Sequence, residues 1–181
     1  MDESITSGRA YFADSARCPP FSHLVTTGGA IGSGPPTALG AAIACPGRRV
    51  INLQADGSAM YSLPAFWSMA RENADVVVII CSNAAYTILE IELANCRLGS
   101  TGRAARSLTS LTKPSIDWVS LGKGAGIAAS ARASTTEELE RLLTAALARR
   151  GPSLIEAALV PPAAAAAALA AAPPRGFLTM A

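Results

Sequence analysis

The amino-acid sequence predicts a doubly wound α/β domain, in which a mainly parallel sheet carries helices on both faces. Two short runs rich in β-branched residues support this fold, RVINLQ at 49–54 and DVVVIIC at 75–81. After Asp75, the second run is apolar at every position, which is typical of a strand that helices bury on both faces. Segments with helical apolar spacing alternate with these strands, and such alternation favours a parallel sheet.

The bounds of the individual helices and strands are predicted from apolar periodicity, helix-capping residues and helix-breaking residues. Residues 1–27 show no sustained period and are predicted to be an irregular lead-in, and the polar, basic stretch 97–115 is predicted to be a long loop. Helices are predicted at 37–44, 59–73, 87–96, 116–124 and 135–149, the last one starting on the cap Thr135-Thr136-Glu137-Glu138. Strands are predicted at 49–54, 75–81, 126–133 and 153–159.

The chain is long enough for one domain with a proper core. We assign residues 1–159 to that domain, and residues 160–181 to an Ala/Pro-rich, low-complexity tail. Alanine is only weakly hydrophobic and prolines flank the tail on both sides, so no membrane span is expected there.

Composition and charge narrow the classes of partner. The formal net charge is +2 and only 15% of the residues are charged, which gives no reason to expect nucleic acid or a membrane as partner. The four cysteines form no CxxC pair and His23 is the single histidine, so no zinc site is expected. Reduced thiols and a polar start, MDESITSGRA, favour a cytoplasmic setting.

Two polar residues stand where predicted strands end. Asp56 follows the strand at 49–54, and Asn83 follows the next strand, 27 residues later. That distance is about one strand–helix–strand crossover, so the two side chains can lie side by side at the carboxyl edge of the sheet, where ligands bind. Alone, each residue is more often an ordinary turn or cap residue.

Together the two side chains suit a hard cation. With one backbone carbonyl from the turn after Asn83, three oxygen ligands converge, and Mg²⁺ accepts such a set when phosphate and water complete its octahedron. Gly57-Ser58-Ala59 opens a helix whose first N–H groups favour an anion. A metal site beside an anion site indicates a diphosphate ester.

The chain resembles the C-terminal, diphosphate-binding domain of thiamine diphosphate-dependent enzymes. The family motif Gly-Asp-Gly, followed some two dozen residues later by Asn-Asn, is matched at Ala55-Asp56-Gly57 and Ser82-Asn83. The likeness extends upstream to GGAIGSGPPTALGAA and downstream to GPSLIEAAL, and so covers about residues 2–159. It is strongest toward the acetolactate synthase large subunit and benzoylformate decarboxylase group. Ala55 and Ser82 depart from the motif but supply no metal-binding side chain.

The resemblance implies a role for particular residues. Asp56, the side-chain oxygen of Asn83 and the carbonyl of Ala85 would bind Mg²⁺. The backbone amides of Gly57 and Ser58 would hold the diphosphate. Tyr86 matches the tyrosine of the family's Asn-Asn-x-x-Tyr pattern.

The resemblance also implies contacts to the rest of the cofactor. In DESITS, Thr6 would offer a hydroxyl to the diphosphate, with Ser4 and Ser7 as weaker candidates. In GGAIG, Ile31 would wedge between the two cofactor rings, and the carbonyl of Gly29 would accept a hydrogen bond from the aminopyrimidine. The alternative for Ile31 is an ordinary core isoleucine.

No catalytic residue is expected in this chain. In the family, a glutamate on a separate pyrimidine-binding domain activates the cofactor, and Glu90 and Glu92 are interpreted as surface or substrate-side groups instead. The chain is therefore expected to be inactive alone, as a fragment or as one subunit. Its partner would be a pyrimidine-binding domain in the same longer chain or a separate subunit, within a homodimer or tetramer.

The expected function is that of a thiamine diphosphate- and Mg²⁺-dependent enzyme acting on a 2-oxo acid, by decarboxylation or carboligation. Two alternatives stay open, a non-catalytic cofactor-binding or assembly domain and the β subunit of a split 2-oxo acid decarboxylase. A generic nucleotide-binding domain is weaker, because no suitable strand leads into GAIGSG.

Overall fold

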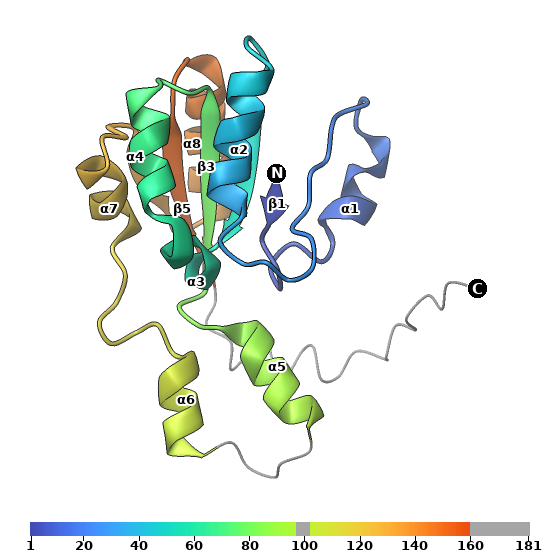
Figure 1. The fold of residues 1–181 in the computed structure, drawn as a ribbon, viewed down its shortest axis with the longest axis vertical. Helices are drawn as coiled ribbons and strands as arrows, with labels where there is room; N and C mark the ends of the chain where they lie inside the picture. Colours follow the sequence, from blue (N-terminus) through green and yellow to red (C-terminus); the bar gives the residue numbers. More distant parts are fainter. Residues whose placement is uncertain (97–101, 160–181) are drawn as a thin grey trace.

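A computed structural model describes residues 1–96 and 102–159, which form a parallel five-stranded sheet with helices on both faces (Figure 1). All pairings between neighbouring strands are parallel, which confirms the predicted fold class. In sheet order the strands are β1 (Asp2–Glu3), β2 (Val50–Ala55), β3 (Val76–Ser82), β5 (Ser153–Ala158) and β4 (Ser130–Ala133).

Helices cover the two faces unequally. One face carries α2 (Gly34–Ala44), α4 (Pro64–Arg71) and α7 (Trp118–Gly124), and the other carries α8 (Thr136–Ala148) (Figure 1). On the first face Phe66 packs edge-on against Trp118, with ring centroids 6.5 Å apart. On the second, Val77 and Ile79 belong to the cluster that α8 covers. Strand β3 is thus buried from both sides, which explains its unbroken apolar run.

Two predicted helices have different bounds in the structure. Helix α2 begins at Gly34, three residues before the predicted start, because Pro35 and Pro36 occupy its first turn, where no N–H is needed. The predicted helix at 59–73 is three pieces, α3 (Asp56–Ala59), the 3₁₀ turn η2 (Met60–Ser62) and α4. Helix α4 starts anew at Pro64, which cannot donate to a preceding turn.

The lead-in at 1–27 is not wholly irregular. Strand β1 pairs with β2, with Asp2 opposite Leu53 and Glu3 opposite Gln54. Helix α1 (Tyr11–Asp14) and the 3₁₀ turn η1 (Ser15–Arg17) follow. A strand of two residues is too short to show a period, so the sequence pattern could not reveal it.

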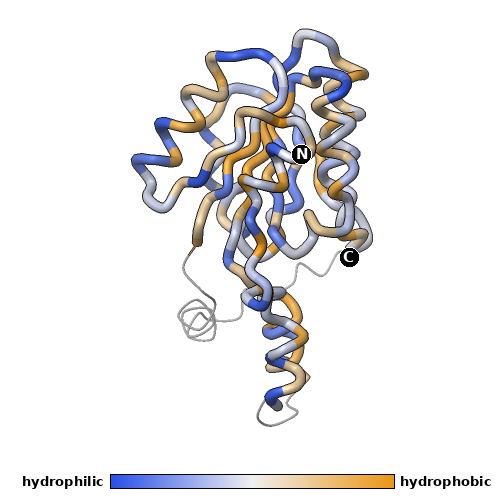
Figure 2. The backbone as a smooth tube through the Cα atoms, turned by 90° about the vertical axis from the view of Figure 1, so that its left-hand side faces the viewer, coloured by the Kyte–Doolittle hydropathy of each residue, from blue (hydrophilic) through white to orange (hydrophobic). Residues whose placement is uncertain are grey.

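The predicted loop at 97–115 also contains structure. Within its described part lies α6 (Arg103–Thr109), which pairs with α5 (Thr87–Asn95). We call α5 and α6 together the arm, since they project from the body below the carboxyl ends of the strands (Figures 1 and 2). Hydrophobic segments gather along the strands in the interior (Figure 2).

The remaining predictions differ at the ends of elements. Helix α7 starts two residues after the predicted 116, and β4 is the last half of the predicted strand at 126–133. The predicted tail, 160–181, lies outside the described residues. Within 1–96 and 102–159, no helix is both long and apolar enough to span a bilayer.

An ionic network closes the amino ends of the strands. Asp75, just before β3, lies 2.7 Å from Nε of Arg49 and accepts a hydrogen bond of 2.6 Å from Arg150. The guanidinium of Arg49 also donates to the carbonyls of Ala146 and Arg149, at the end of α8. This network joins β2, β3 and α8 at the edge far from the arm.

Candidate cofactor site

Asp56 lies in the gap between the carboxyl ends of β2 and β3. It is the first residue of α3 and is 2% exposed. One carboxylate oxygen accepts the N–H of Gly57 (2.8 Å) and the other accepts the N–H of Ala84 (2.7 Å). Burial raises the pKa of Asp56, and these backbone donors oppose the shift. The carboxylate thus ties the helix after β2 to the loop after β3.

The loop at 83–86 is held from several directions. The side-chain oxygen of Asn83 accepts the N–H of Ala85 (3.0 Å), which fixes the amide orientation, and its nitrogen donates to Thr87 (3.0 Å). Ala84 adopts a left-handed backbone, with φ of 57°. From the end of α6, the carbonyl of Thr109 accepts the N–H of Tyr86 at 2.8 Å.

The donor set at these strand ends fits Mg²⁺. Asp56, Asn83 and the Ala85 carbonyl offer hard oxygens, and the two side-chain groups keep lone pairs beyond those that accept backbone N–H groups. Among the described residues, no group of three or more His, Cys, Asp or Glu side chains could hold a metal. A carboxylate, an amide and a carbonyl together suit a cation whose remaining ligands are phosphate and water. The three ligands themselves stay a prediction.

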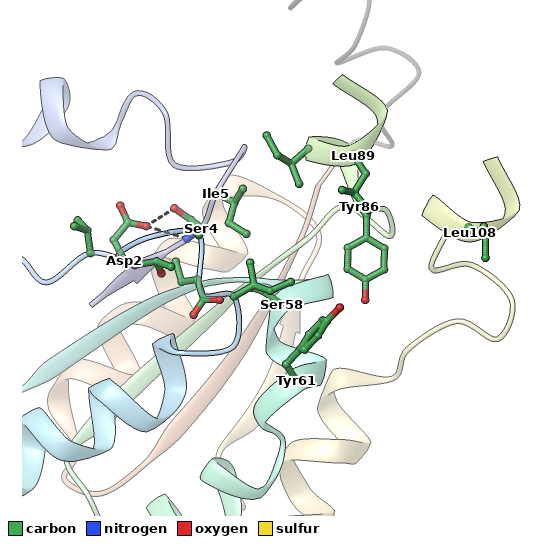
Figure 3. A pocket seen from close by; sticks show the side chains of 14 residues that line it. Asp2, Ser4, Ile5, Ser58, Tyr61, Tyr86, Leu89 and Leu108 are labelled. Atoms are coloured by element: carbon green, nitrogen blue, oxygen red, sulfur yellow. Dashed lines mark hydrogen bonds between the residues drawn. The ribbon is translucent and has the colours of Figure 1, made fainter. Parts of the chain in front are cut away.

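A cavity of about 800 Å³ opens beside this loop (Figure 3). It brings together residues from five separate segments of the chain. Four of the predicted cofactor contacts line it, Gly29, Ile31, Ser58 and Tyr86. Further lining residues that the sequence did not indicate include Ile5, Tyr61, Leu89 and Leu108. A cavity of this size is of the kind that holds a drug-sized ligand or cofactor.

Asp56 and Asn83 line a second, smaller pocket of about 220 Å³, with Trp118, Arg132 and Glu156. The structure therefore separates the predicted metal ligands from the predicted ring contacts. Ser58 and Tyr86 line the larger cavity and also lie close to Asp56, since Ser58 belongs to the same short helix and the Tyr86 hydroxyl contacts the carbonyl of Gly57, the residue after Asp56.

Gly57 and Tyr86 pack closely at this junction. A Cβ at Gly57 would lie 2.4 Å from the Tyr86 ring, so a larger residue would push the ring away. The Tyr86 hydroxyl donates weakly to the Gly57 carbonyl, at 3.4 Å. Burial, with Tyr61 and Asp56 nearby, raises the pKa of Tyr86. The hydroxyls of Tyr61 and Tyr86 face the same space in Figure 3.

The structure shows where the predicted ring contact Ile31 and the DESITS stretch lie relative to the cavity. Ile31 is 40% exposed and lines the cavity, so it is not a core residue, and its wedge role stays a prediction. From the DESITS stretch, Ser4 and Ile5 line the cavity, and the Ser4 hydroxyl donates to Asp2 at 2.5 Å. Thr6 is half-buried in the same turn, and its contact to a diphosphate stays a prediction.

Sequence reasoning missed two buried polar residues beneath the site. Glu3 accepts hydrogen bonds from the backbone N–H groups of Gly32 and Gly34. Gln54 donates to the Ser58 hydroxyl at 2.7 Å. A signal for Gln54 was present, because Asn52 and Gln54 put two polar side chains on one face of an otherwise apolar strand.

The fold and the site define a class of protein, an α/β cofactor-binding domain that holds its ligand at the carboxyl edge of a parallel sheet. Residues 7–157 match the family model "Thiamine pyrophosphate enzyme, C-terminal TPP binding domain". The chain therefore belongs to this family of thiamine diphosphate (thiamine pyrophosphate) enzymes, as its motifs indicated.

Known proteins agree with this assignment. Over 160 residues the chain is 44% identical to the Mycobacterium tuberculosis protein described as "Putative acetolactate synthase large subunit IlvX", covering 88% of this chain and 31% of that protein. It is 34% identical over 156 residues to benzoylformate decarboxylase of Pseudomonas aeruginosa, covering 86% and 28%. The chain thus spans about a third of the length of these relatives or less.

A solved structure shows the same likeness. The thiamine diphosphate-dependent 4-hydroxybenzoylformate decarboxylase of Rhodococcus jostii RHA1 superposes with a TM-score of 0.64 and 35% identity. The match covers 72% of this chain and 23% of that one. The chain is thus similar to the C-terminal domain of acetolactate synthase-like proteins and 2-oxo acid decarboxylases.

Proposed function

We propose that this chain supplies the thiamine diphosphate- and Mg²⁺-binding half of a 2-oxo acid decarboxylase or carboligase of the acetolactate synthase type. The observation that carries the proposal is the buried Asp56 carboxylate, which accepts the N–H of Ala84 next to Asn83. This contact places a carboxylate and an amide oxygen at neighbouring strand ends, as a metal–diphosphate site requires. The names of the relatives support the reaction class.

Different residues would contact different parts of the cofactor. Asp56, Asn83 and the Ala85 carbonyl would hold Mg²⁺, while Gly57, Ser58 and Thr6 would hold the diphosphate. Gly29 and Ile31 would orient the rings within the cavity, and Tyr86 would close the junction between the two parts. When bound, thiamine diphosphate supplies the electron sink for decarboxylation of a 2-oxo acid. The chain's own task is to bind and orient it, and to exclude water around it.

The site needs a covering surface. Apolar side chains stand exposed at the mouth of the cavity, with exposed fractions of 53% for Val25, 64% for Tyr61 and 79% for Leu108. Exposed apolar surface around a ligand cavity marks an interaction site. We infer that a pyrimidine-binding domain covers it, from the same longer chain or a separate subunit, in a homodimer or tetramer. We propose a cytoplasmic setting, with residues 1–159 as the domain unit and neither nucleic acid nor membrane as partner.

Calorimetric titration tests the proposal. Thiamine diphosphate is titrated into the purified chain with and without Mg²⁺, alone and together with a separately expressed pyrimidine-binding domain from a related enzyme. We expect magnesium-dependent binding that Asp56→Ala abolishes. A folded chain that binds no thiamine diphosphate in either setting contradicts the proposal. Binding in the assembled pair without turnover of any 2-oxo acid favours the non-catalytic alternative.

A further inference from the structure

Glu3 is a buried carboxylate that the proposed cofactor contacts do not use. It lies on β1 opposite Gln54 of β2, and its side chain turns inward, so that the residue is 2% exposed. Its two carboxylate oxygens accept the backbone N–H groups of Gly32 and Gly34, respectively. Gly32 and Gly34 lie 29 and 31 positions after Glu3 in the sequence, respectively. A charge buried at a strand end in this way needs such donors to be tolerated.

The two N–H groups belong to the segment that carries the predicted ring contacts. We call residues 28–34 the glycine segment. Gly28, Gly29 and Gly32 all have positive φ, at 60°, 68° and 87°. This backbone is accessible to glycine but also leaves the segment many other conformations. Backbone hydrogen bonds from the N–H groups of Ala30, Ile31 and Ser33 hold part of this shape. The Glu3 carboxylate adds the contacts at the end of the segment, to Gly32 and to Gly34, the first residue of α2.

The end of the glycine segment is fitted closely around Glu3. A Cβ at Gly34 would lie 2.6 Å from a Glu3 carboxylate oxygen and 2.1 Å from the Gln54 side-chain oxygen. The carboxylate also lies at the amino end of α2, where its charge complements the helix dipole. Glu3 therefore takes the place that an anionic ligand would otherwise find at this helix end.

The same pair of strands reaches the diphosphate half of the site. Gln54, opposite Glu3, donates to the Ser58 hydroxyl, which in turn donates to the Ala55 carbonyl at 3.1 Å. Gly34 packs against both Glu3 and Gln54. Neighbouring side chains on β1 and β2 thus fix the ring half and the phosphate half of one cavity.

We propose that Glu3 is a positioning residue that holds the glycine segment in the shape that accepts the cofactor rings. The proposal rests on the proposed function, because Gly29 and Ile31 are taken to contact the rings. Glu3 acts on ring recognition through the segment, while the metal and diphosphate contacts at 56–58 and 83–85 have supports of their own. Loss of Glu3 should therefore affect the two halves of the cofactor unequally.

The test compares two probes on Glu3→Gln, which keeps the size of the side chain but turns one acceptor into a donor. With Mg²⁺ present, the Kd for thiamine diphosphate is expected to rise about ten- to one-hundred-fold. The Kd for inorganic diphosphate is expected to stay within about twofold. A residue with only a general structural role would weaken both probes equally, and that outcome overturns the proposal, as does a Kd for thiamine diphosphate that does not change.

Hydrogen exchange of the free chain supplies a second readout that needs no ligand. In Glu3→Gln, peptides that cover the glycine segment are expected to exchange at least about tenfold faster, while those of β2 and β3 keep their rates. Unchanged exchange in the segment overturns the proposal. A wild-type chain that binds neither probe, either alone or together with the pyrimidine-binding domain, contradicts the proposed function, and the exchange rates then decide the role of Glu3 by themselves.

Two further variants, one that perturbs the Glu3 contact from Gly34 and one matched control, complete the test. Gly34→Ala pushes on the Glu3 carboxylate and, more closely, on the Gln54 amide that holds Ser58. It is therefore expected to weaken the binding of both probes, in contrast to Glu3→Gln, and to speed exchange in the glycine segment. Glu72→Gln is the matched control, since Glu72 is an exposed acid that pairs with Arg71. It should leave both Kd values and the exchange rates as in the wild type. A Gly34→Ala protein with wild-type exchange in the glycine segment counts against the proposal.

Discussion

Two carboxylates at opposite ends of the same sheet are held in different ways. Asp75, at the amino end of β3, faces the guanidinium groups of Arg49 and Arg150. Asp56, at the carboxyl end of β2, accepts only N–H groups of the backbone, and among the described residues it takes part in no ion pair. One charge is neutralised within the fold and the other is not.

The difference fits a structural role for Asp75 and the proposed metal-binding role for Asp56. A buried anion beside cationic side chains completes the fold, whereas a buried anion held by neutral donors is disfavoured until a cation arrives. The raised pKa of Asp56 expresses the same fact, because burial without a counter-charge favours the protonated acid. The absence of a counter-charge at Asp56 among the described residues therefore supports the proposed cation at the carboxyl edge of the sheet.

The largest expected effect distinguishes the two carboxylates by binding. Asp56→Ala should lower the magnesium-dependent affinity for thiamine diphosphate by at least about one-hundred-fold, because the proposed metal ligand is removed. Asp75→Ala should leave that affinity within about threefold. Calorimetry on both variants checks this. Equal losses of affinity in the two variants would show that the two carboxylates do not differ in their role in binding.

The second-largest expected effect is on stability, where we expect Asp75 to contribute more than Asp56. Asp75→Ala should lower the free energy of unfolding by about 2–3 kcal/mol, since it leaves the largely buried Arg49 without its acid. Urea titration followed by circular dichroism measures this value. Asp56→Ala should lower the unfolding free energy by less than Asp75→Ala does. If Asp75→Ala lowers the unfolding free energy by less than Asp56→Ala does, the ionic network at the amino ends of the strands does not contribute to stability as proposed.

The third effect is a pH dependence of the free chain. The pKa of Asp56 is raised above its ordinary 3.8, so its contribution to stability is full below that value and is lost as pH rises through the folded-state pKa. The unfolding free energy of the wild type, relative to Asp56→Ala, should therefore fall as pH rises across this window. Mg²⁺ affinity should rise over the same window. A relative stability that increases with pH contradicts the assignment.

The smallest expected effect tests whether cofactor affinity depends on the carboxyl edge of the sheet outside the cavity. Thr135 caps α8 there by accepting the N–H of Glu138 at 3.2 Å, and Glu138 accepts the N–H of Ser134 at 2.7 Å. Thr135→Ala should lower the unfolding free energy by about 1 kcal/mol. It should leave thiamine diphosphate affinity unchanged, because the cap lies outside the cavity. Weakened binding would show that the site depends on the whole edge.

Local patterns predicted much of this arrangement. The apolar run of β3 and the cap of α8 each depend on residues close in sequence, and both were recognised. The adjacency of Asp56 and Asn83 followed from parallel order, and β2 and β3 are indeed neighbours. In each case the period, the cap or the crossover length is written within one stretch of chain.

Contacts between distant segments were beyond such patterns. Strand β1 exists only because Asp2 and Glu3 meet residues more than fifty positions away. The Glu3 carboxylate reaches the glycine segment, and the cavity takes Leu108 from α6, where the sequence indicated only a loop. A single charged residue in a polar lead-in carries no signal of the backbone that it will contact.

The arm has a mechanical consequence. It begins at the 83–86 loop and returns to it, since the N–H of Leu111 donates to the Ala84 carbonyl at 2.9 Å and the N–H of Tyr86 to the Thr109 carbonyl. The Thr109 hydroxyl also donates to Glu90, which braces α5 against α6. The arm is thus anchored to this loop at both of its ends, so a partner that bound the arm would contact a part of the chain hydrogen-bonded directly to Ala84 and Tyr86.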